Sequence, residues 1–554
     1  MTAVRALADR YLEDLAHLDP TVATGLGRSF GQGALPDLSP EGASEHVELA
    51  RRALRELSTL ADEDPVDRRC RGLMEDRLGL VLSRFGAGEH LRPLSVLAGA
   101  PAEIQGAFEL MATDSDDDWA NVAARVSALP RALSSLRASL EEGIRSGVLA
   151  APRQALSTAH QLSTWAGRHG GIPYFASLAD RAPERLRPRV GAGIPAANEA
   201  LADLADWLTA TYATAAATVP DAVGRDRYIV SARQFLGSDL DPDEAYEWGW
   251  AELERIEAEM RRLANEIKPG ASIDGAMGWL DVHGEAAEGE AELQRFLQTL
   301  MDETIDALQG THFDLAEPIR TVEAMIAPPG GAAAQYYTQP SADFSRPGRT
   351  WYPTMGKTRF PLWNEVSTCY HEGVPGHHLQ IAQWIYLAPQ MSLFQGAFFI
   401  SGNGEGWALY AERLMDELGF LSEPGRRLGY LVAQQLRAAR VVVDIGMHLS
   451  MPIPNGQPFH PGERFTPALG REFMGLHAGK DPVFLDSEWE RYLGWPGQAI
   501  CYKLGERVWL AGRDAARLNA TRAGRPFDQK AWHMAALSMG STGLDQLAAE
   551  LPHL

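Results

Sequence analysis

Residues 370–380 read Tyr-His-Glu-Gly-Val-Pro-Gly-His-His-Leu-Gln, and this stretch decides how the chain around it can fold. His371 is followed directly by Glu372, a pairing typical of sites in which a histidine binds zinc and the next glutamate activates water. In the usual H-E-x-x-H motif the two histidines lie four residues apart on one face of a helix. Here His377 and His378 come six and seven residues after His371.

A regular helix through this segment would not bring two of these histidines to one ion. Position i+6 would point roughly 120° away from His371, and position i+7 would lie about 10.5 Å along the axis. Pro375 interrupts the helix because its ring clashes with the carbonyl group of His371, and Gly376 permits a backbone that other residues resist. We therefore expect a bulge or kink, and a bulge of two residues would restore the H-E-x-x-H relation between His371 and His377. The alternative is a helix end that carries surface histidines.

A metal site of this kind needs a third protein ligand and an open position for water. The candidate segment is residues 402–412, Gly-Asn-Gly-Glu-Gly-Trp-Ala-Leu-Tyr-Ala-Glu. Its glycines and the helical pattern that follows predict that Glu405 lies in the first turn of a helix, with Glu412 two turns later on the same face. One of the two could bind the metal while the other orients a ligand. Taken alone, Glu405 would be an acidic residue favoured by a helix N-terminus.

The two segments, residues 371–380 and 405–412, resemble the bacterial domain-of-unknown-function 885 family. The resemblance covers most of the chain and extends to residues 37–40, 336–340, 345–348 and 496–503. It implies a zinc metallopeptidase. The Gly376-His377 step is also similar to the Gly-His of the H-E-x-G-H motif in thimet-oligopeptidase-like and carboxypeptidase-Taq-like enzymes, and this favours His377 over His378 as the second ligand.

Apolar residues at three- and four-residue spacing predict a mainly α fold. The clearest helical stretches are residues 43–62, 119–149, 193–217, 243–267 and 290–309, and residues such as Asp241 mark their starts. Residues 321–327 and 349–353 look like short strands that flank a loop. We expect a large helical shell with a small β-sheet beside the metal-binding helices. That sheet could hold an extended substrate by strand addition, or it could be a hairpin that closes the core.

The expected division is an N-terminal helical region, residues 1–225, and a catalytic metal-binding region, residues 226–554, interleaved around one cleft. Three cysteines, at 70, 369 and 501, do not suggest a disulfide framework. The formal charge of −22 argues against nucleic acid or an anionic membrane as a partner. The N-terminus lacks the pattern of a secretion signal, and no apolar segment approaches the length of a membrane span, so we expect a cytoplasmic protein. The sequence does not indicate an oligomeric state.

Two further groups of residues are candidates. Arg437, Arg440, Asp444 and His448 are spaced to share one helical face, where an arginine could hold a substrate carboxylate or the set could form an internal salt-bridge network. Tyr502 could stabilise a developing oxyanion or be a buried structural tyrosine. A loop with Arg346 and either Tyr336 or Tyr337 could line the cleft.

These residues predict a zinc-dependent hydrolase of short peptides or peptide-like amides. His371, His377 and Glu405 would hold one zinc ion, Glu372 would act as general base and Tyr502 would stabilise the oxyanion. Gln380 and Glu412 could orient ligands, while His378 is an alternative ligand or a hydrogen-bond donor to substrate.

Two other functions stay open at this point. One is a metal-dependent biosynthetic or catabolic enzyme that acts on a small amide or amino-acid conjugate, because a fold does not determine a substrate. The other is an inactive binding or scaffold protein. Glu372 argues against the latter, since a structural zinc site has four protein ligands and needs no base.

Overall fold

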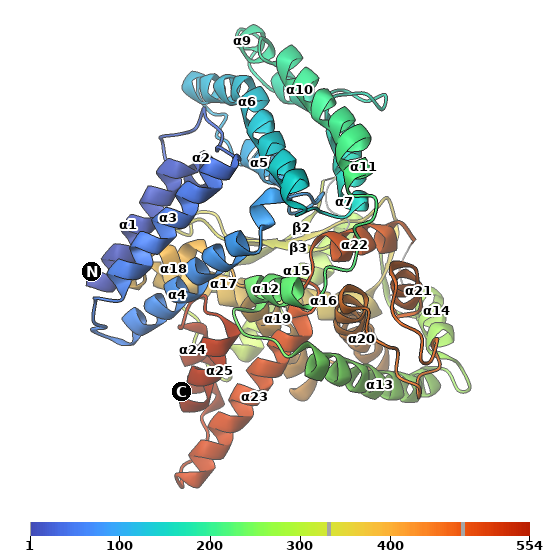
Figure 1. The fold of residues 1–554 in the computed structure, drawn as a ribbon. Helices are drawn as coiled ribbons and strands as arrows, with labels where there is room; N and C mark the ends of the chain where they lie inside the picture. The colour runs from blue at the N-terminus through green and yellow to red at the C-terminus, as the bar shows by residue number, and fades with distance from the viewer. Residues whose placement is uncertain (1, 329–333, 478–481) are drawn as a thin grey trace. The chain divides into compact units, whose positions relative to one another are not determined.

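The computed structural model describes residues 2–328, 334–477 and 482–554 (Figure 1). It divides into two compact units. The first unit comprises Met1–Glu63, Met74–Val230 and Glu490–Pro496, and the second comprises Asp64–Leu73, Ser231–Trp489 and Gly497–Leu554. The main change of unit, between Val230 and Ser231, lies five residues beyond the expected boundary after residue 225, and two short segments belong to the other unit.

The first unit is helical. Its α-helices are α1 (Ala3–Leu18), α2 (Pro20–Gly25), α3 (Pro40–Leu57), α5 (Ala100–Glu109), α6 (Asp116–Ser146), α7 (Pro152–Trp165), α8 (Tyr174–Asp180), α9 (Arg187–Gly191), α10 (Ile194–Trp207) and α11 (Ala213–Ala215). A π-helical turn, Leu208–Tyr212, joins α10 to α11. The core gathers buried faces of α6, α7 and α10, with Leu136, Leu162 and Leu201 among its members. The division between units falls within α4 (Pro65–Gly86), α12 (Arg225–Leu236) and α22 (Pro482–Gly494).

The second unit contains the predicted functional residues. Its α-helices are α13 (Pro242–Ile267), α14 (Ile273–His283), α15 (Glu290–Leu308), α16 (Glu365–Glu372), α17 (His377–Leu387), α18 (Leu393–Ala397), α19 (Ser401–Glu417), α20 (Pro424–Leu449), α21 (Pro467–His477), α23 (Cys501–Arg522), α24 (Gln529–Leu537) and α25 (Leu544–Glu550). Within this unit α19 packs along α23, and α13 packs along α20. The mainly α fold predicted from the sequence is confirmed.

Individual helices also lie where the periodicity predicted them. The five stretches named above correspond to α3, α6, α10 with the turn that follows it, α13 and α15. Asp241 is the N-cap of α13 and accepts hydrogen bonds from the backbone N–H groups of Asp243 and Glu244. Such a cap satisfies donors that the first helical turn leaves free, which is why an aspartate before a proline marks this start.

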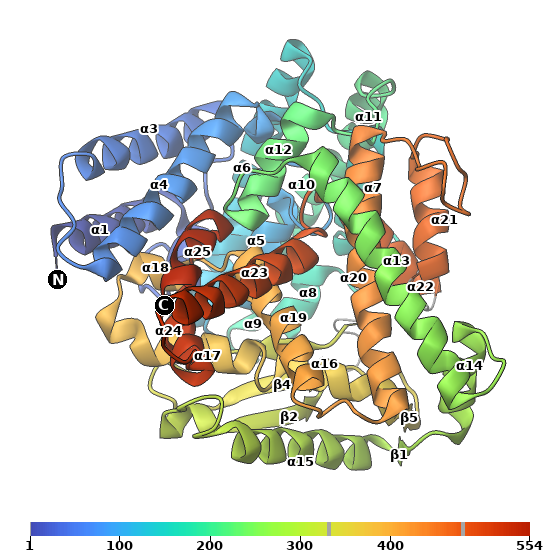
Figure 2. The ribbon, with the colours of Figure 1, turned by 90° about the horizontal axis from the view of Figure 1, so that it is seen from below.

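Two small sheets accompany the helices of the second unit. Strands β2 (Val322–Ile326) and β4 (Gly348–Tyr352) confirm the two predicted strands, but they pair in parallel and therefore do not form a hairpin. Strand β3 (Tyr336–Thr338), which was expected to be a loop, pairs antiparallel with β4 on its other side. The second sheet joins β1 (Ala286–Glu288) to β5 (Arg359–Pro361). In Figure 2 the three-stranded sheet lies between α15, which contacts β2, and α17, which contacts β4.

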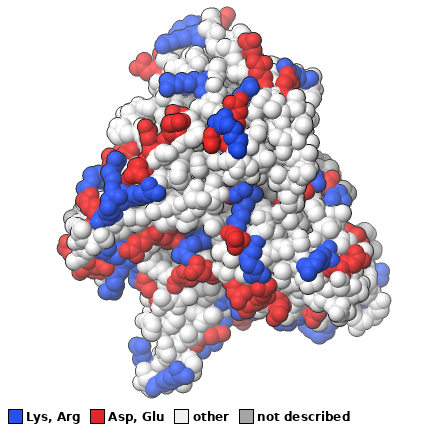
Figure 3. All heavy atoms as spheres, in the orientation of Figure 1, with Lys and Arg blue, Asp and Glu red and all other residues white. Residues whose placement is uncertain are grey.

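Charge is spread over the surface. Despite the formal charge of −22, Figure 3 shows acidic and basic side chains interspersed over the face in view, with no continuous field of one sign. Among the described residues, no helix is both long and apolar enough to cross a membrane. The three cysteines are buried thiols.

Candidate metal centre

The helix is interrupted between His371 and His377, as the sequence predicted. Helix α16 ends at Glu372 and α17 begins at His377. Gly373 and Gly376 have ψ values of −118° and −128°, far from helical, and the Val374–Pro375 peptide bond is cis. The chain changes direction at the break, so His377 does not lie on a continuation of α16.

Gly376 is required because two parts of the backbone touch at the break. A Cβ atom at this position would lie 1.9 Å from the carbonyl oxygen of His371 and 2.4 Å from that of Tyr370. The N–H group of Gly376 donates to that Tyr370 oxygen at 3.0 Å, and the N–H of His378 donates to the Gly373 oxygen at 3.2 Å. Any side chain at residue 376 would therefore push the two histidines apart.

Trp407 of α19 forms hydrogen bonds with the backbone of the break. Its Nε1–H group donates to the carbonyl oxygens of Pro375, at 2.9 Å, and Gly376, at 3.2 Å. Backbone carbonyl groups that a helix break leaves without helical donors are costly to bury, so this indole supplies a donor to the Pro375 oxygen. The Gly376 oxygen also accepts the backbone N–H of Gln380, at 3.2 Å. Trp407 was not recognised as a functional candidate in the sequence, although it lies only two residues from Glu405.

Helix α19 presents Glu405 to the break. It begins at Ser401, so Glu405 lies in the second turn and not in the first turn, as expected from the sequence. The glycines before it serve packing instead of a helix start. A Cβ atom at Gly404 would lie 2.1 Å from the ring of Phe399, and one at Gly406 would lie 2.5 Å from the carbonyl carbon of Gly505 in α23.

Three predicted ligands converge at this point. Oε2 of Glu405 lies 3.3 Å from Nε2 of His371 and 3.4 Å from Nε2 of His377. The ligand atoms of all three residues lie within 4.8 Å of one another, and the two imidazole rings are nearly perpendicular, at 86°. Ligand atoms bound about 2.0–2.2 Å from one ion at tetrahedral angles lie about 3.3–3.6 Å apart. The two distances from Glu405 to the histidines therefore match the ligand spacing of a zinc site.

The donor set also fits a metal. Two histidines and one carboxylate are the ligands of a catalytic zinc site, which keeps its fourth position for water or substrate. Oε2 of Glu405 is buried and has no hydrogen-bond partner among the described residues. An oxygen in that situation is expensive to bury unless a cation lies against it.

Electrostatics at the cluster favour charged forms. Burial acts to lower the pKa of His371, but the carboxylates of Glu405 and Glu412 outweigh it and raise the pKa to about 9. Burial acts to raise the pKa of Glu405, yet the imidazoles of His371 and His377 hold it below its ordinary value.

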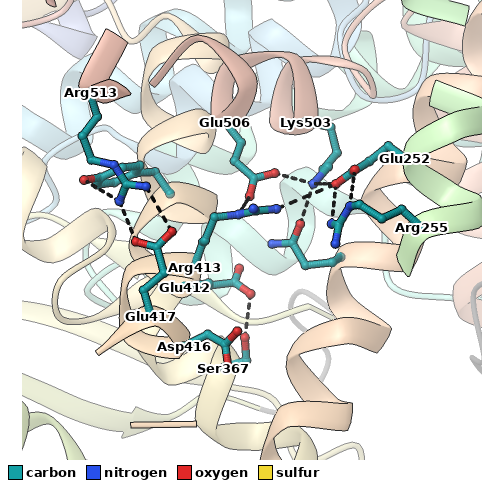
Figure 4. A network of polar contacts seen from close by, with 12 residues as sticks. Glu252, Arg255, Ser367, Glu412, Arg413, Asp416, Glu417, Lys503, Glu506 and Arg513 are labelled. Carbon is teal, nitrogen blue, oxygen red and sulfur yellow. Dashed lines mark hydrogen bonds and ion pairs between the residues drawn. The ribbon is translucent and has the colours of Figure 1, made fainter. Parts of the chain in front are cut away.

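Glu412 orients His371, which is one of the roles that the spacing of the two glutamates suggested. Its Oε1 atom lies 2.8 Å from Nδ1 of His371. Its Oε2 atom accepts a hydrogen bond from Ser367 at 2.6 Å (Figure 4). A carboxylate on Nδ1 leaves Nε2 as the atom that would face a metal and would make it a stronger ligand. Arg437 lies 3.7 Å from the same Oε1 atom.

His378 faces away from the cluster. Its Nε2 atom lies 2.8 Å from the carbonyl oxygen of Ile319, and its Nδ1 atom lies 3.0 Å from the hydroxyl of Tyr337. Burial lowers the pKa of His378 to about 4, so the ring is neutral. With both nitrogens engaged elsewhere, His378 ties α17 to β3, and His377 is the histidine that joins His371. Tyr337 lies in strand β3, and its hydroxyl contacts His378.

The other residues predicted for the site lie on three helices of the second unit, Glu372 on α16, Gln380 on α17 and Tyr502 on α23. Glu372 is the last residue of α16 and is 8 % exposed. Tyr502, the second residue of α23, has its ring 4.9 Å from the guanidinium of Arg440. Gln380 donates to Asn403 at 3.0 Å and so links α17 to α19. The catalytic roles predicted for Glu372 and Tyr502 remain predictions.

The stripe on α20 forms polar contacts within the second unit. Arg440 donates to Glu488 at 2.6 Å, and Asp444 accepts from the backbone N–H of Gly497 at 2.8 Å. His448 lies 3.9 Å from Asp444. These contacts match the internal network that was one of the two readings of this stripe.

Comparisons with known proteins find solved structures with a similar fold. A solved structure described as a "putative lipoprotein" from Colwellia psychrerythraea is similar, with a TM-score of 0.83 and 20 % identity over 99 % of this chain and 98 % of the other. Another "putative lipoprotein", from Shewanella oneidensis, has a TM-score of 0.76 and 17 % identity, with 99 % of both chains covered. At these identities the likeness concerns the fold alone. A search of curated proteins finds no match.

The family comparison covers almost the whole chain. Residues 20–551 match the model of the family described as bacterial protein of unknown function, DUF885. This agrees with the resemblance carried by residues 371–380 and 405–412. The chain belongs to the DUF885 family.

Proposed function

We propose that this protein is a zinc-dependent hydrolase that cleaves amide bonds in short peptides or peptide-like substrates. The observation that carries the proposal is the convergence of His371, His377 and Glu405, whose ligand atoms lie within 4.8 Å of one another. The hydrogen bond between Glu412 and His371 supports it, because a ligand held by a carboxylate is typical of zinc sites.

The roles of the residues follow from their chemistry. A zinc ion held by this triad would lower the pKa of water toward about 7 and polarise a carbonyl group. Glu372, next to His371, would take a proton from the attacking water and pass it to the leaving amine. The hydroxyl of Tyr502, whose ring is held against Arg440, would donate to the oxyanion.

Burial of the cluster favours a small or extended substrate. The side chain of Glu405 is 16 % exposed, and that of His377 is 9 % exposed. Such limited access suits a short peptide or a small amide better than a loop on a folded protein. The acidic charge of the chain gives no support to a nucleic-acid substrate.

A cytoplasmic location is part of the proposal. It is tested by fractionating cells of the source organism, with detection of the protein in soluble and membrane fractions. Recovery with the membranes would instead agree with the description of the two similar structures.

The decisive experiment combines metal analysis with a peptide-library assay. We expect one zinc per chain and hydrolysis of short peptides by the native protein. Glu372→Gln should keep the metal and lower kcat by about 100-fold or more, whereas the exposed control Glu303→Gln should change neither. Absence of stoichiometric metal, or full activity of Glu372→Gln, would contradict the mechanism.

The same assay separates the other two functions. Metal without hydrolysis of any peptide would favour an enzyme that acts on a small amide or amino-acid conjugate. A protein that binds peptides without cleaving them or any such conjugate would be a binding protein.

A further inference from the structure

Arg437 is an unusual cation in the second unit because its guanidinium group donates no hydrogen bond to any described residue. Its side chain is 14 % exposed, and its Nε atom is buried without a partner. Its closest carboxylate oxygen is Oε1 of Glu412, at 3.7 Å, which is beyond hydrogen-bond distance. Glu412 instead accepts from His371 and Ser367.

Neighbouring arginines of the same unit behave differently. Arg413 donates to Glu506 at 3.0 Å, and Arg513 donates to both oxygens of Glu417, at 2.6 and 3.0 Å (Figure 4). On α20 itself, Arg427 donates to both oxygens of Asp416 and Arg440 donates to Glu488. Each of these four arginines has a hydrogen-bonded carboxylate partner, and Arg437 has none.

The position of Arg437 places its donors close to the candidate metal centre. Glu412 lies between them, 2.8 Å from Nδ1 of His371 and 3.7 Å from Nη2 of Arg437. Nη2 of Arg437 therefore lies within the sum of those two distances of Nδ1 of His371, and a metal on the opposite nitrogen, Nε2, would lie up to roughly 4 Å farther away. An extended residue spans about 3.3–3.6 Å, so one or two residues together with the hydrogen bond to the guanidinium can cover that range.

We propose that Arg437 binds the C-terminal carboxylate of the substrate, so that the enzyme releases one or two residues from the C-terminus of a short peptide. This inference rests on the proposed hydrolase function. A guanidinium has five donors in a planar fork that fits a carboxylate with two parallel hydrogen bonds. A C-terminal amide is neutral and offers a single acceptor oxygen, so it cannot form this pair.

The test uses pairs of peptides that differ only in having a free or an amidated C-terminus. The wild-type enzyme should prefer the free acid by about 10- to 100-fold in kcat/KM, the range expected for hydrogen bonds between charged groups. Arg437→Met should bring the ratio of kcat/KM for acid and amide close to one, and this ratio, not the absolute rate on either peptide, is the readout. Arg437→Lys, which keeps the charge but loses the fork, should retain only part of it.

Arg427→Lys is the matched control, because it alters a half-buried arginine on the same helix that is paired with Asp416. It should leave the acid-to-amide ratio unchanged. The inference is wrong if wild-type enzyme cleaves acid and amide equally. It is also wrong if Arg437→Met slows both peptides and weakens zinc binding to the same degree, since Arg437 would then only balance the charge of Glu412.

A binding measurement separates this inference from the proposed function. Zinc-loaded Glu372→Gln protein is titrated calorimetrically with Ala-Ala-Ala and with its C-terminal amide. Tighter binding of the acid, lost in the Glu372→Gln/Arg437→Met double variant, supports the carboxylate site even if the native protein hydrolyses no peptide. Equal affinities overturn it even if the native protein proves to be a peptidase.

Discussion

Glu412 lies 2.8 Å from Nδ1 of His371 in the interior of the second unit, and Glu412 has no exposed surface. Glu405, seven residues earlier on the same helix, approaches the other nitrogen of that imidazole at 3.3 Å. One face of α19 therefore supplies both a candidate metal ligand and the group that orients a second ligand. This arrangement leads to predictions about metal binding that do not depend on the substrate.

Replacing Glu412 with Gln should weaken zinc binding by about 10- to 100-fold, because the neutral amide no longer strengthens His371 as a ligand. Competition with a chromophoric chelator measures the affinity. Glu417→Gln removes a carboxylate from the same helix that pairs with Arg513, away from the cluster, and should leave zinc affinity unchanged. Equal effects of the two variants would show that Glu412 acts only through general stability.

Replacing Gly376 with Ala should destabilise the protein by about 1–3 kcal/mol or more, because the new methyl group would meet the His371 carbonyl at 1.9 Å. Zinc affinity should fall as well, because the backbone between His371 and His377 must move to make room for the methyl group. Urea unfolding and metal titration report the two effects. Gly396→Ala is the control, because nothing lies within 4 Å of a Cβ there.

Replacing Trp407 with Phe should remove the donor that serves the Pro375 and Gly376 carbonyl oxygens, lowering stability by about 1–3 kcal/mol and weakening zinc binding. Trp532→Phe loses a comparable buried bond, from Nε1 to the Leu551 oxygen, outside the break. That variant should lose stability but keep its zinc affinity. If Trp407→Phe kept its zinc affinity, these hydrogen bonds would not contribute to the geometry of the metal centre.

Zinc should stabilise the second unit against heat. A ligand that binds only the folded state adds about 2.7 kcal/mol when its free concentration is 100 times Kd. Differential scanning calorimetry with buffered zinc should therefore show a Tm that rises with zinc in the wild type and stays constant in His377→Ala. A zinc-dependent Tm in His377→Ala would place the bound metal elsewhere.

His533 should make stability sensitive to acid. Burial lowers its pKa to about 3, and its neutral ring lies 2.7 Å from the Tyr410 hydroxyl and 3.2 Å from the His312 carbonyl oxygen. In the unfolded chain this imidazole has a pKa of about 6.5, so between about pH 6.5 and pH 3 it binds a proton that the folded form does not bind. Stability from this group is therefore complete above about pH 6.5 and declines toward pH 3, by up to about 1.4 kcal/mol per pH unit.

The pH effect is measured as the difference in unfolding free energy between wild type and His533→Gln from pH 7 to pH 4. The difference should shrink as the pH falls. His553→Gln, which replaces an exposed histidine, serves as the control. A difference between wild type and His533→Gln that does not vary with pH would contradict the role given to His533.

Much of the fold could be predicted because its causes are local. The start of α13 follows from the cap at Asp241, and helix periodicity located α3, α6, α13 and α15. Strand β3 was missed because its three residues carry little pattern and its pairing partner, β4, lies across a loop. The second-turn position of Glu405 was missed because glycines that usually mark a helix end here allow close packing.

The sequence by itself determined the break between His371 and His377, because Pro375 and Gly376 act on their own backbone, and it limited the third ligand to Glu405 or Glu412. Only the tertiary structure decided that Glu405 joins the histidines and that Glu412 and Trp407 hold them in place. It also decided that His378 turns to Tyr337 and that Nε of Arg437 is buried without a hydrogen-bond partner among the described residues. The physical reason is distance along the chain. These contacts join separate helices and strands, and their geometry depends on packing between elements that no local pattern encodes.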